Sequence, residues 1–383
     1  MSFQLLKKDP YTQARLGRYA TAHGSFETPV FMPVGTVGTV KAMRPDELKG
    51  LGAEIILGNT YHLYLRPGHL LIKELGGLHA FMNWPGPILT DSGGYQVFSL
   101  SQTCRLREDG VEFQSHLDGS KHLLTPELAI EIQEALGSDI MMVLDECLPY
   151  PSELSRAQSS MELTLRWAER CLLSRTGENS LFCIVQGGTF QGLRKECAER
   201  LVALDGKNPG KSFEGFALGG LSVGEPMPLA YEIAGNTTPY LPEQKPRYLM
   251  GVGMPEDIVT CIGLGIDMFD CVVPTRMARH GTMFTKFGRI NIRGSEFAKD
   301  SGPLEEGCSC YTCQNFSRAY LRHLSLSKEI LSAILNTIHN LHYFLNLLGQ
   351  ARRAIAEGNY AKFQKEFFQQ IQSGEIGANQ KSF

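Results

Sequence analysis

Short apolar runs alternate with helical patterns along most of the chain. Eight runs end in small or polar residues, and they begin at Val30, Glu54, Pro87, Asp139, Leu181, Gly215, Tyr248 and Asp267. Helical patterns separate most of them, at residues 67–75, 125–136, 152–173, 191–204 and 254–263. Thr125 is suited to be an N-cap, with Pro126 as the first helical residue. Eight similar strand–helix units predict a (β/α)8 TIM barrel of the α/β class and fit a doubly wound open sheet less well.

Three segments fall outside this repeat. Residues 1–27 read as two extended segments around Asp9 and Pro10, which predicts an N-terminal β-layer. Residues 95–122 form an insertion whose alternating pattern at 111–120 predicts a hairpin. A second hairpin and a cysteine cluster lie within residues 281–313. We therefore expect two parts: a barrel with its β-layer over 1–280, and a basic hairpin, zinc-binding subdomain and C-terminal helices over 281–383.

The expected strand ends carry polar residues. Barrel enzymes place their sites at the carboxyl ends of the strands, which here hold Asn59, Thr60, Asp91, Ser92, Asp145, Glu146, Gln186, Gly219, Gly220 and Asp270. Carboxylates, an amide and glycine backbone at one mouth can hydrogen-bond the edges of a planar heterocycle and attack an atom beside it.

The eighth run contains a buried-strand carboxylate. Asp270 interrupts an apolar stretch, where a carboxylate is costly unless it is paired or used. From Cys271 to Ser295 the chain has no acidic residue and five basic ones: Arg276, Arg279, Lys286, Arg289 and Arg293. This combination suggests chemistry on a polyanion. The alternative is a structural aspartate that caps a turn beside a solvated loop.

Composition narrows the class of protein. The chain has 383 residues, 43% of them hydrophobic, and a formal net charge of -3, so the basic stretch is local. The N-terminus has no apolar segment of a secretion signal, and no apolar stretch reaches transmembrane length. We expect a cytoplasmic protein without a membrane partner, whose ten cysteines are reduced.

Three of these cysteines lie within six residues. Cys308, Cys310 and Cys313 supply three soft ligands, and a tetrahedral zinc site needs one more. His323, His339 and His342 are the downstream candidates. A closed shell of three cysteines and a histidine leaves no position for water, which predicts one structural Zn²⁺ per chain.

At this point the motifs match a known family. T-D-S-G-G-Y-Q-V-F at Thr90, V-Q-G-G at Val185, G-G-L-S-V-G-E at Gly219 and F-D-C-V-V-P-T-R at Phe269 resemble the bacterial tRNA-guanine transglycosylases (the queuine tRNA-ribosyltransferase family) over nearly the whole chain. That family exchanges guanine at the tRNA wobble position for a 7-deazaguanine base. The resemblance implies His339 as the fourth zinc ligand.

The resemblance also implies roles for residues at the barrel mouth. Asp270 corresponds to the nucleophile on the ribose C1′, and Asp91 to the general acid/base. A covalent two-step displacement needs such a pair. The implied substrate-binding residues are Asp91, Ser92, Gly93, Gly94, Tyr95, Asp145, Gln186, Gly220, Leu221 and Met250. Tyr95 and Met250 are expected to stack on the two faces of the base, which must first be flipped out of the RNA loop.

RNA contacts are implied for two segments. They are Gly251, Val252, Gly253, Met254, Pro255, Glu256 and Asp257, followed by Thr275, Arg276, Met277, Ala278 and Arg279. The two arginines match those that read neighbours of the target base in a U-G-U anticodon loop. Family members act as homodimers, and we expect the same here.

Alternative functions fit the sequence less well. A non-catalytic RNA-binding relative is expected to lose its nucleophile, whereas Asp270, Asp91, Asp145 and Gln186 are all present. A nucleoside glycosidase does not need the basic stretch, and a metal-dependent barrel hydrolase needs an H-x-H pair that the first strand lacks. An archaeal-type enzyme has further C-terminal RNA-binding domains.

The motif at Gly219 bears on the inserted base. Eukaryotic relatives that accept queuine resemble this motif with glycine in place of Val223. A valine there reduces the space, with Cys147 on the other side of the expected pocket. We expect 7-aminomethyl-7-deazaguanine (preQ1) to fit, with its ammonium on the Leu221 carbonyl and Glu225 holding that peptide.

Overall fold

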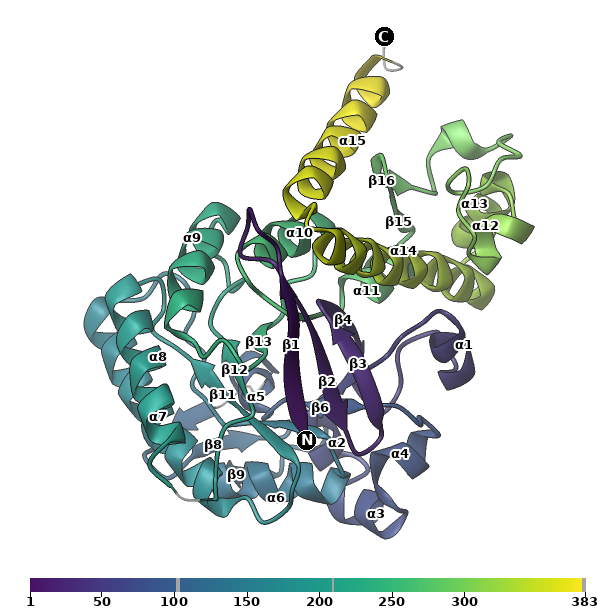
Figure 1. Cartoon of the computed structure of the whole chain (residues 1–383). Coiled ribbons are helices and arrows are strands. Elements are labelled where there is room, and N and C mark those ends of the chain that lie inside the picture. The colour runs from purple at the N-terminus through teal and green to yellow at the C-terminus, as the bar shows by residue number, and fades with distance from the viewer. Residues whose placement is uncertain (101–103, 209, 381–383) are drawn as a thin grey trace.

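The chain folds around a closed barrel of eight parallel strands (Figure 1). The computed structural model describes residues 1–100, 104–208 and 210–380. Around the barrel the strands follow the order β10, β11, β12, β13, β14, β4, β5, β6. Their bounds are β4 Val30–Gly35, β5 Ile56–Gly58, β6 Ile88–Thr90, β10 Ile140–Met142, β11 Ser180–Val185, β12 Gly215–Leu218, β13 Arg247–Leu249 and β14 Met268–Cys271. The predicted (β/α)8 barrel is therefore confirmed, and the doubly wound sheet is excluded.

The barrel strands are buried on both faces. Residues of β4, β11 and β12 are buried throughout, as expected for parallel strands covered by helices. The barrel closes between β14 and β4, where Asp270 lies opposite Met32. This pairing places Asp270 at the end of the strand that closes the barrel.

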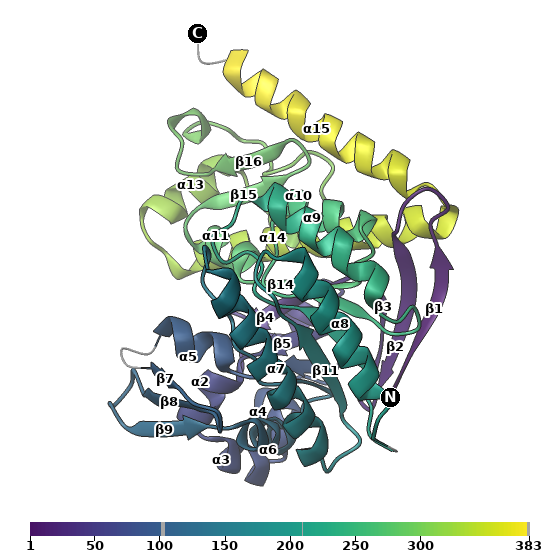
Figure 2. The ribbon, with the colours of Figure 1, turned by 90° about the vertical axis from the view of Figure 1, so that its left-hand side faces the viewer.

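Helices surround the barrel (Figure 2). Their bounds are α1 Pro45–Gly50, α2 Thr60–Leu65, α3 His69–Glu74, α4 Gly77–Met82, α5 Gly94–Leu100, α6 Pro126–Leu136, α7 Leu154–Ser174, α8 Gln191–Asp205, α9 Met227–Thr237, α10 Pro255–Gly263 and α11 Val273–Arg279. The Thr125 hydroxyl accepts from the Leu128 amide at 3.2 Å, so the predicted N-cap is present. The segment predicted as one helix at 67–75 begins only at His69, after Gly68 with φ of 104°.

An antiparallel sheet covers the amino ends of the barrel strands. It comprises β1 Ser2–Lys8, β2 Arg15–Thr21 and β3 Gly24–Thr28, so the predicted β-layer has three strands where we expected two segments. The Tyr19 hydroxyl on β2 donates to the Ser180 hydroxyl at the start of β11 over 2.6 Å. This contact ties the layer to the barrel.

The insertion after the third barrel strand forms a small sheet. β8 Val111–Gln114 and β9 Lys121–Leu124 are the predicted hairpin, and β7 Cys104–Leu106 adds a strand that the sequence pattern did not reveal. Part of this insertion, residues 101–103, lies outside the described residues.

The C-terminal part contains the second predicted hairpin and four helices. The hairpin is β15 Thr282–Thr285 with β16 Gly288–Asn291, and the helices are α12 Tyr311–Asn315, α13 Arg318–Leu326, α14 Ile330–Glu357 and α15 Tyr360–Gln380. Two short 3-10 turns, Thr238–Tyr240 and Ser295–Phe297, complete the elements. A small separate core lies here, yet α14 contributes Leu335 to it and Phe344 to the barrel core. The division at residue 280 therefore stays a prediction. No helix in the described ranges is long and apolar enough to cross a membrane.

Candidate active site and metal centre

A cavity of about 400 Å³ opens at the carboxyl ends of the barrel strands. Three carboxylates from three strand ends line it: Asp91, Asp145 and Asp270. Most of the predicted base-binding residues also line it, namely Ser92, Gly93, Tyr95, Gly220, Leu221 and Met250. Its size lies within the range of small-molecule sites and suits one planar heterocycle with part of its sugar.

Two predicted residues lie behind the cavity wall. Gln186 is only 2% exposed, and its side-chain amide donates to Asp145 Oδ2 over 2.6 Å. Gly94 begins α5, and a Cβ there would lie 3.0 Å from the Asp145 carbonyl oxygen. Gln186 therefore acts on the cavity through the Asp145 carboxylate, and Gly94 packs against the Asp145 backbone.

Asp270 is held by two donors on one oxygen. The Tyr248 hydroxyl donates to Asp270 Oδ1 over 2.6 Å and the Gly251 amide over 2.8 Å. Burial raises the pKa of Asp270, and these two hydrogen bonds act against that rise because they favour the carboxylate. Within the described residues Oδ2 accepts no hydrogen bond that would compete with a substrate.

Asp91 sits at the end of β6 in a denser network. Its carboxylate accepts from Asn59 at 2.6 Å, from the Thr60 amide at 2.8 Å and from Gln96 at 2.9 Å. Burial nevertheless raises the pKa of Asp91 to about 6, and the charge of Asp270 adds to the rise. A carboxyl group with a pKa in this range can give and take a proton near neutral pH.

Asp145 follows β10, which neighbours the β6 strand of Asp91 and lies across the barrel from the β14 strand of Asp270. Burial raises its pKa to about 6, against the hydrogen bond from Gln186, and the neighbouring Glu146 adds to the rise. Glu146 is itself paired with Arg156. When ionised, Asp145 presents acceptors suited to adjacent ring and amino N–H groups of a purine.

The turn after β12 needs glycine at two successive positions. A Cβ at Gly219 would lie 2.5 Å from Ile184 Cγ2, and one at Gly220 would lie 2.5 Å from Gln186 Oε1. Gly220 also has φ of 61°. The backbone of this turn therefore lies so close to Gln186 that only glycine fits.

Glu225 orients the next peptide of this turn. Its carboxylate accepts from the amides of Ser222 and Val223, the latter over 3.0 Å. In a trans peptide the carbonyl points opposite to the N–H. The Leu221 carbonyl therefore points away from Glu225, and Leu221 lines the cavity.

Two members of the site were not singled out from the sequence. Tyr248 precedes Met250 by two residues, so both side chains share one face of the β13 strand end. Gln96 follows Tyr95 in the T-D-S-G-G-Y-Q motif. The available signals were the place of Gln96 in that motif and of Tyr248 at the start of the seventh apolar run, but only the fold pairs Tyr248 with Asp270 and Gln96 with Asp91.

A smaller basic pocket of about 230 Å³ lies beside the main cavity. Its lining includes Lys41, Thr275, Arg276, Arg279 and His280. Burial and the charge of Arg276 lower the pKa of Arg279. Val34, Thr36 and Val272 line both hollows, so the two are neighbours at one mouth.

The other residues predicted to contact RNA are placed differently. Gly251 lines the main cavity, whereas Gly253 packs against Cys271. Pro255, Glu256 and Asp257 begin α10 after Met254. Val252 and Ala278 are buried, and Met277 packs against the barrel core. RNA contacts of these residues stay predictions.

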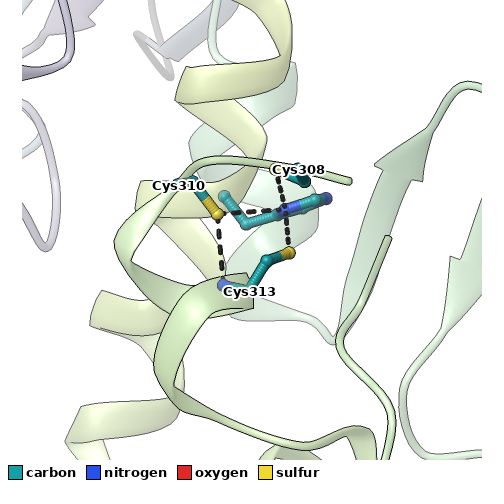
Figure 3. Close-up of side chains that lie close together, drawn as sticks. Cys308, Cys310 and Cys313 are labelled. Atoms are coloured by element: carbon teal, nitrogen blue, oxygen red, sulfur yellow. Dashed lines mark hydrogen bonds between the residues drawn. The ribbon is translucent and has the colours of Figure 1, made fainter. Parts of the chain in front are cut away.

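The cysteine cluster converges on one histidine (Figure 3). His339 Nδ1 lies 3.9, 3.5 and 3.3 Å from the Sγ atoms of Cys308, Cys310 and Cys313. Tetrahedral zinc with ordinary bond lengths requires sulfur–nitrogen separations of about 3.6 Å. The four residues are buried and form a group that can hold a metal ion.

The hydrogen bonding of the His339 ring suits a role as a metal ligand. Its Nε2 donates to the Phe284 carbonyl on β15 over 2.8 Å, which leaves the Nδ1 lone pair for a metal. His342 lies 3.7 Å from Cys308 and also contacts Ser309, but only His339 reaches all three thiols among the described residues. His323 lies on α13 outside the group.

A second group of possible ligands has the wrong geometry for an ion. His23 and His79 each contact one oxygen of Asp139, at 2.9 and 3.2 Å. Their rings stack with centroids 3.5 Å apart and planes 15° apart. A metal ion must lie near the plane of each ligating ring, which one ion between two stacked rings cannot do. This group ties the β2–β3 turn to the start of β10.

A (β/α)8 barrel with carboxylates converging at its mouth and a separate Cys3His group is typical of a barrel enzyme. A family model described as "Queuine tRNA-ribosyltransferase" (TGT) matches residues 9–373. The chain therefore belongs to the queuine tRNA-ribosyltransferase family, whose members are tRNA-guanine transglycosylases, enzymes of the glycosyltransferase class.

Curated relatives of this family are similar to the chain over almost the full length of both proteins. A queuine tRNA-ribosyltransferase of Caldanaerobacter subterraneus is 58% identical over 96% of both chains. That of Bacillus velezensis is 54% identical over 100% of this chain and 98% of its own. That of Symbiobacterium thermophilum is 52% identical over 99% of this chain and 94% of its own.

Proposed function

We propose that this enzyme exchanges guanine at the tRNA wobble position for preQ1 through a covalent enzyme–RNA intermediate. The observation that carries the proposal is the convergence of Asp270, Asp91 and Asp145 on one cavity beside a basic pocket. The first two provide a nucleophile and a proton carrier, and the third provides a reader of the base.

In the first half-reaction an oxygen of Asp270 attacks the ribose C1′. The bond from C1′ to N9 of guanine breaks, and its electron pair moves to the base. Asp91, protonated in part near neutral pH because its pKa is about 6, gives its proton to the departing base. The products are free guanine and an ester between Asp270 and the RNA.

The second half-reaction reverses the roles. The incoming base loses its N9 proton to Asp91, and N9 then attacks C1′ to displace the carboxylate of Asp270. Tyr248 stabilises this leaving carboxylate through the hydrogen bond that it donates in the free enzyme. The proton balance closes because Asp91 returns to its starting state.

Base recognition is assigned to the opposite wall. Ionised Asp145 accepts from the N–H groups of guanine or preQ1, while Tyr95 and Met250 cover the two faces of the ring. Tyr95 is 54% exposed without ligand, so it is free to close on a base. The preference for preQ1 is supported by Glu225, which turns the Leu221 carbonyl toward the cavity as an acceptor for the aminomethyl group.

The RNA is proposed to be the U-G-U anticodon loop of a tRNA. Arg276 and Arg279 lie in the basic pocket next to the cavity and suit the nucleotides that flank a flipped base. Basic side chains of the hairpin and the metal-binding part are assigned to phosphates.

The metal is proposed to be one structural zinc held by Cys308, Cys310, Cys313 and His339. It would fix the hairpin β15–β16 to α14, because His339 also bonds to Phe284. Homodimerisation and a cytoplasmic location remain proposals. Exposed apolar side chains on α13 and α14 offer a surface for a second copy: Tyr320, Leu326, Ile330 and Leu331.

Exchange of labelled guanine into a tRNA stem-loop tests the activity. The wild type should incorporate guanine and accept preQ1 in its place. With a slow-reacting deaza base, a denaturing gel should show an RNA-shifted protein band that is lost in Asp270→Asn. A band that persists in the variant would assign the nucleophile to another residue, first to Asp91.

A further inference from the structure

A buried arginine without an acidic partner lies behind the base-recognition wall. Arg194, in the first turns of α8, is only 1% exposed. Within the described parts of the chain it forms no ion pair, and its hydrogen-bond partners are three backbone carbonyls. Burying an unpaired guanidinium costs several kcal/mol. Such a cost calls for a role that a neutral side chain of the same size cannot fill.

The three carbonyls belong to the two turns that carry the base-recognition groups. Arg194 Nη1 donates to Val185 over 2.9 Å, and Nε donates to Gly188 over 2.8 Å. These residues flank Gln186, the partner of Asp145. Nη2 donates to Gly220, in the turn after β12, over 3.3 Å. One planar cation therefore connects the ends of β11 and β12.

The hydrogen bond from Arg194 to the Gly220 carbonyl also affects the N–H of the same peptide. A hydrogen bond from a cation polarises a peptide and strengthens its N–H as a donor. In the trans peptide between Gly220 and Leu221 this N–H points away from Arg194. Both residues line the cavity; the Gly220 amide donates to the Cys147 sulfur, whereas within the described residues the Leu221 amide donates to no other group. The turn therefore offers the Leu221 N–H, which has no partner among the described residues, as a donor near the acceptors of Asp145.

Arg194 keeps its charge under working conditions. Burial lowers its pKa to about 10, and the nearby Cys197, Cys147 and Glu225 oppose this fall. The group is thus fully protonated near neutral pH.

We propose that Arg194 is a positioning residue for base recognition. Its cation fixes the turns that carry Gln186 and Gly220. It also polarises the Gly220–Leu221 peptide, so that the N–H of this peptide becomes a better donor to a carbonyl oxygen of the bound heterocycle. The inference rests on the proposed function, since it assumes that a purine-like base occupies the cavity. Arg194 itself touches no substrate.

Two purines test the proposal. Guanine and 6-thioguanine differ in one atom, and sulfur is a weak hydrogen-bond acceptor. Inhibition constants of both are measured against preQ1 incorporation for wild type, Arg194→Met and Arg194→Lys. Arg200→Met is the matched control, because Arg200 lies on the same helix and pairs with Glu162 and Glu196 at the surface.

Wild type should prefer guanine, and Arg194→Met should reduce this preference by up to about tenfold, the size of one neutral hydrogen bond from a peptide N–H to the base. KM for the RNA should stay within about twofold of wild type, since a positioning role for the base leaves phosphate contacts intact. Arg194→Lys should lie between the two, and Arg200→Met should match wild type.

An unchanged guanine preference in a folded Arg194→Met would overturn the proposal, because a merely structural role weakens both purines alike. Should Arg194→Met fail to fold, Arg194→Lys decides: it retains the cation but not the planar fork, so a preference equal to that of wild type counts against the proposal. Absence of exchange in wild type would instead reject the proposed function.

Discussion

Replacing Asp145 by asparagine should stabilise the protein and impair it as an enzyme. Burial raises the pKa of Asp145 from 3.8 to about 6. Because the folded-state pKa lies above the unfolded value, the protonated carboxyl favours the folded state. This contribution is fully present below pH 3.8 and is lost as the pH rises through about 6.

The size of the effect depends on pH. At pH 7.5 the ionised carboxylate lowers the free energy of unfolding by about 3 kcal/mol, and at pH 4.5 by about 1 kcal/mol. An asparagine carries no charge, and its carbonyl oxygen can still accept from Gln186. Asp145→Asn should therefore exceed wild type in unfolding free energy by about 2–3 kcal/mol at pH 7.5, with the gain shrinking toward pH 4.5.

Activity should change in the opposite direction. The substitution removes at least one charge-assisted hydrogen bond to the base, worth about 1.5–3 kcal/mol, so kcat/KM for guanine should fall at least about tenfold. In the wild type, KM for guanine should rise as the pH falls below about 6, because a protonated Asp145 loses an acceptor.

Urea unfolding from pH 4.5 to 7.5 measures the free energy of unfolding of wild type and variant, and guanine exchange measures their activity. Asp118→Asn is the control: hydrogen bonds from Ser120 and Ser115 lower the pKa of this exposed carboxylate to about 2, so its removal should not stabilise the protein at any pH. A stability gain for Asp145→Asn that does not vary with pH, or a loss at pH 7.5, would refute the reasoning.

Three further predictions concern single contacts. Tyr248→Phe removes a donor to Asp270 that lowers the pKa of that carboxyl, so the acidic limb of the kcat/KM profile should move to higher pH; an unmoved limb contradicts the assignment. Metal analysis should give about one zinc per chain, and His339→Ala should lose zinc and thermal stability together; full zinc content in the variant would point to His342. Val223→Gly should gain use of queuine relative to preQ1 in competition assays, since a valine side chain crowds the pocket by roughly 1–3 kcal/mol; comparable use of queuine by wild type would reject the explanation.

Much of the fold could be predicted from local pattern. Parallel strands buried on both faces appear in the sequence as apolar runs, and the start of α6 is visible in Thr125 and Pro126. Where the local signal is weak, prediction was less accurate. The short strand β7 has exposed residues and no apolar run, and positive-φ glycines at 68 and 76 delimit α3, which we expected to be longer.

The sequence by itself determined the barrel, the carboxylates at its mouth and the three cysteines of the candidate metal group, because strand ends and closely spaced thiols are visible in neighbouring residues. Residue spacing left three histidines open as the fourth member of the metal group, and the family resemblance implied His339. The tertiary structure brings His339 to the three thiols from a helix beyond the cluster, with its ring oriented by the Phe284 carbonyl. The pairing of Tyr248 with Asp270 and of Arg194 with Gly220 was likewise settled by the closed barrel, since hydrogen bonds between separate strand ends and helices depend on distances that no local pattern encodes.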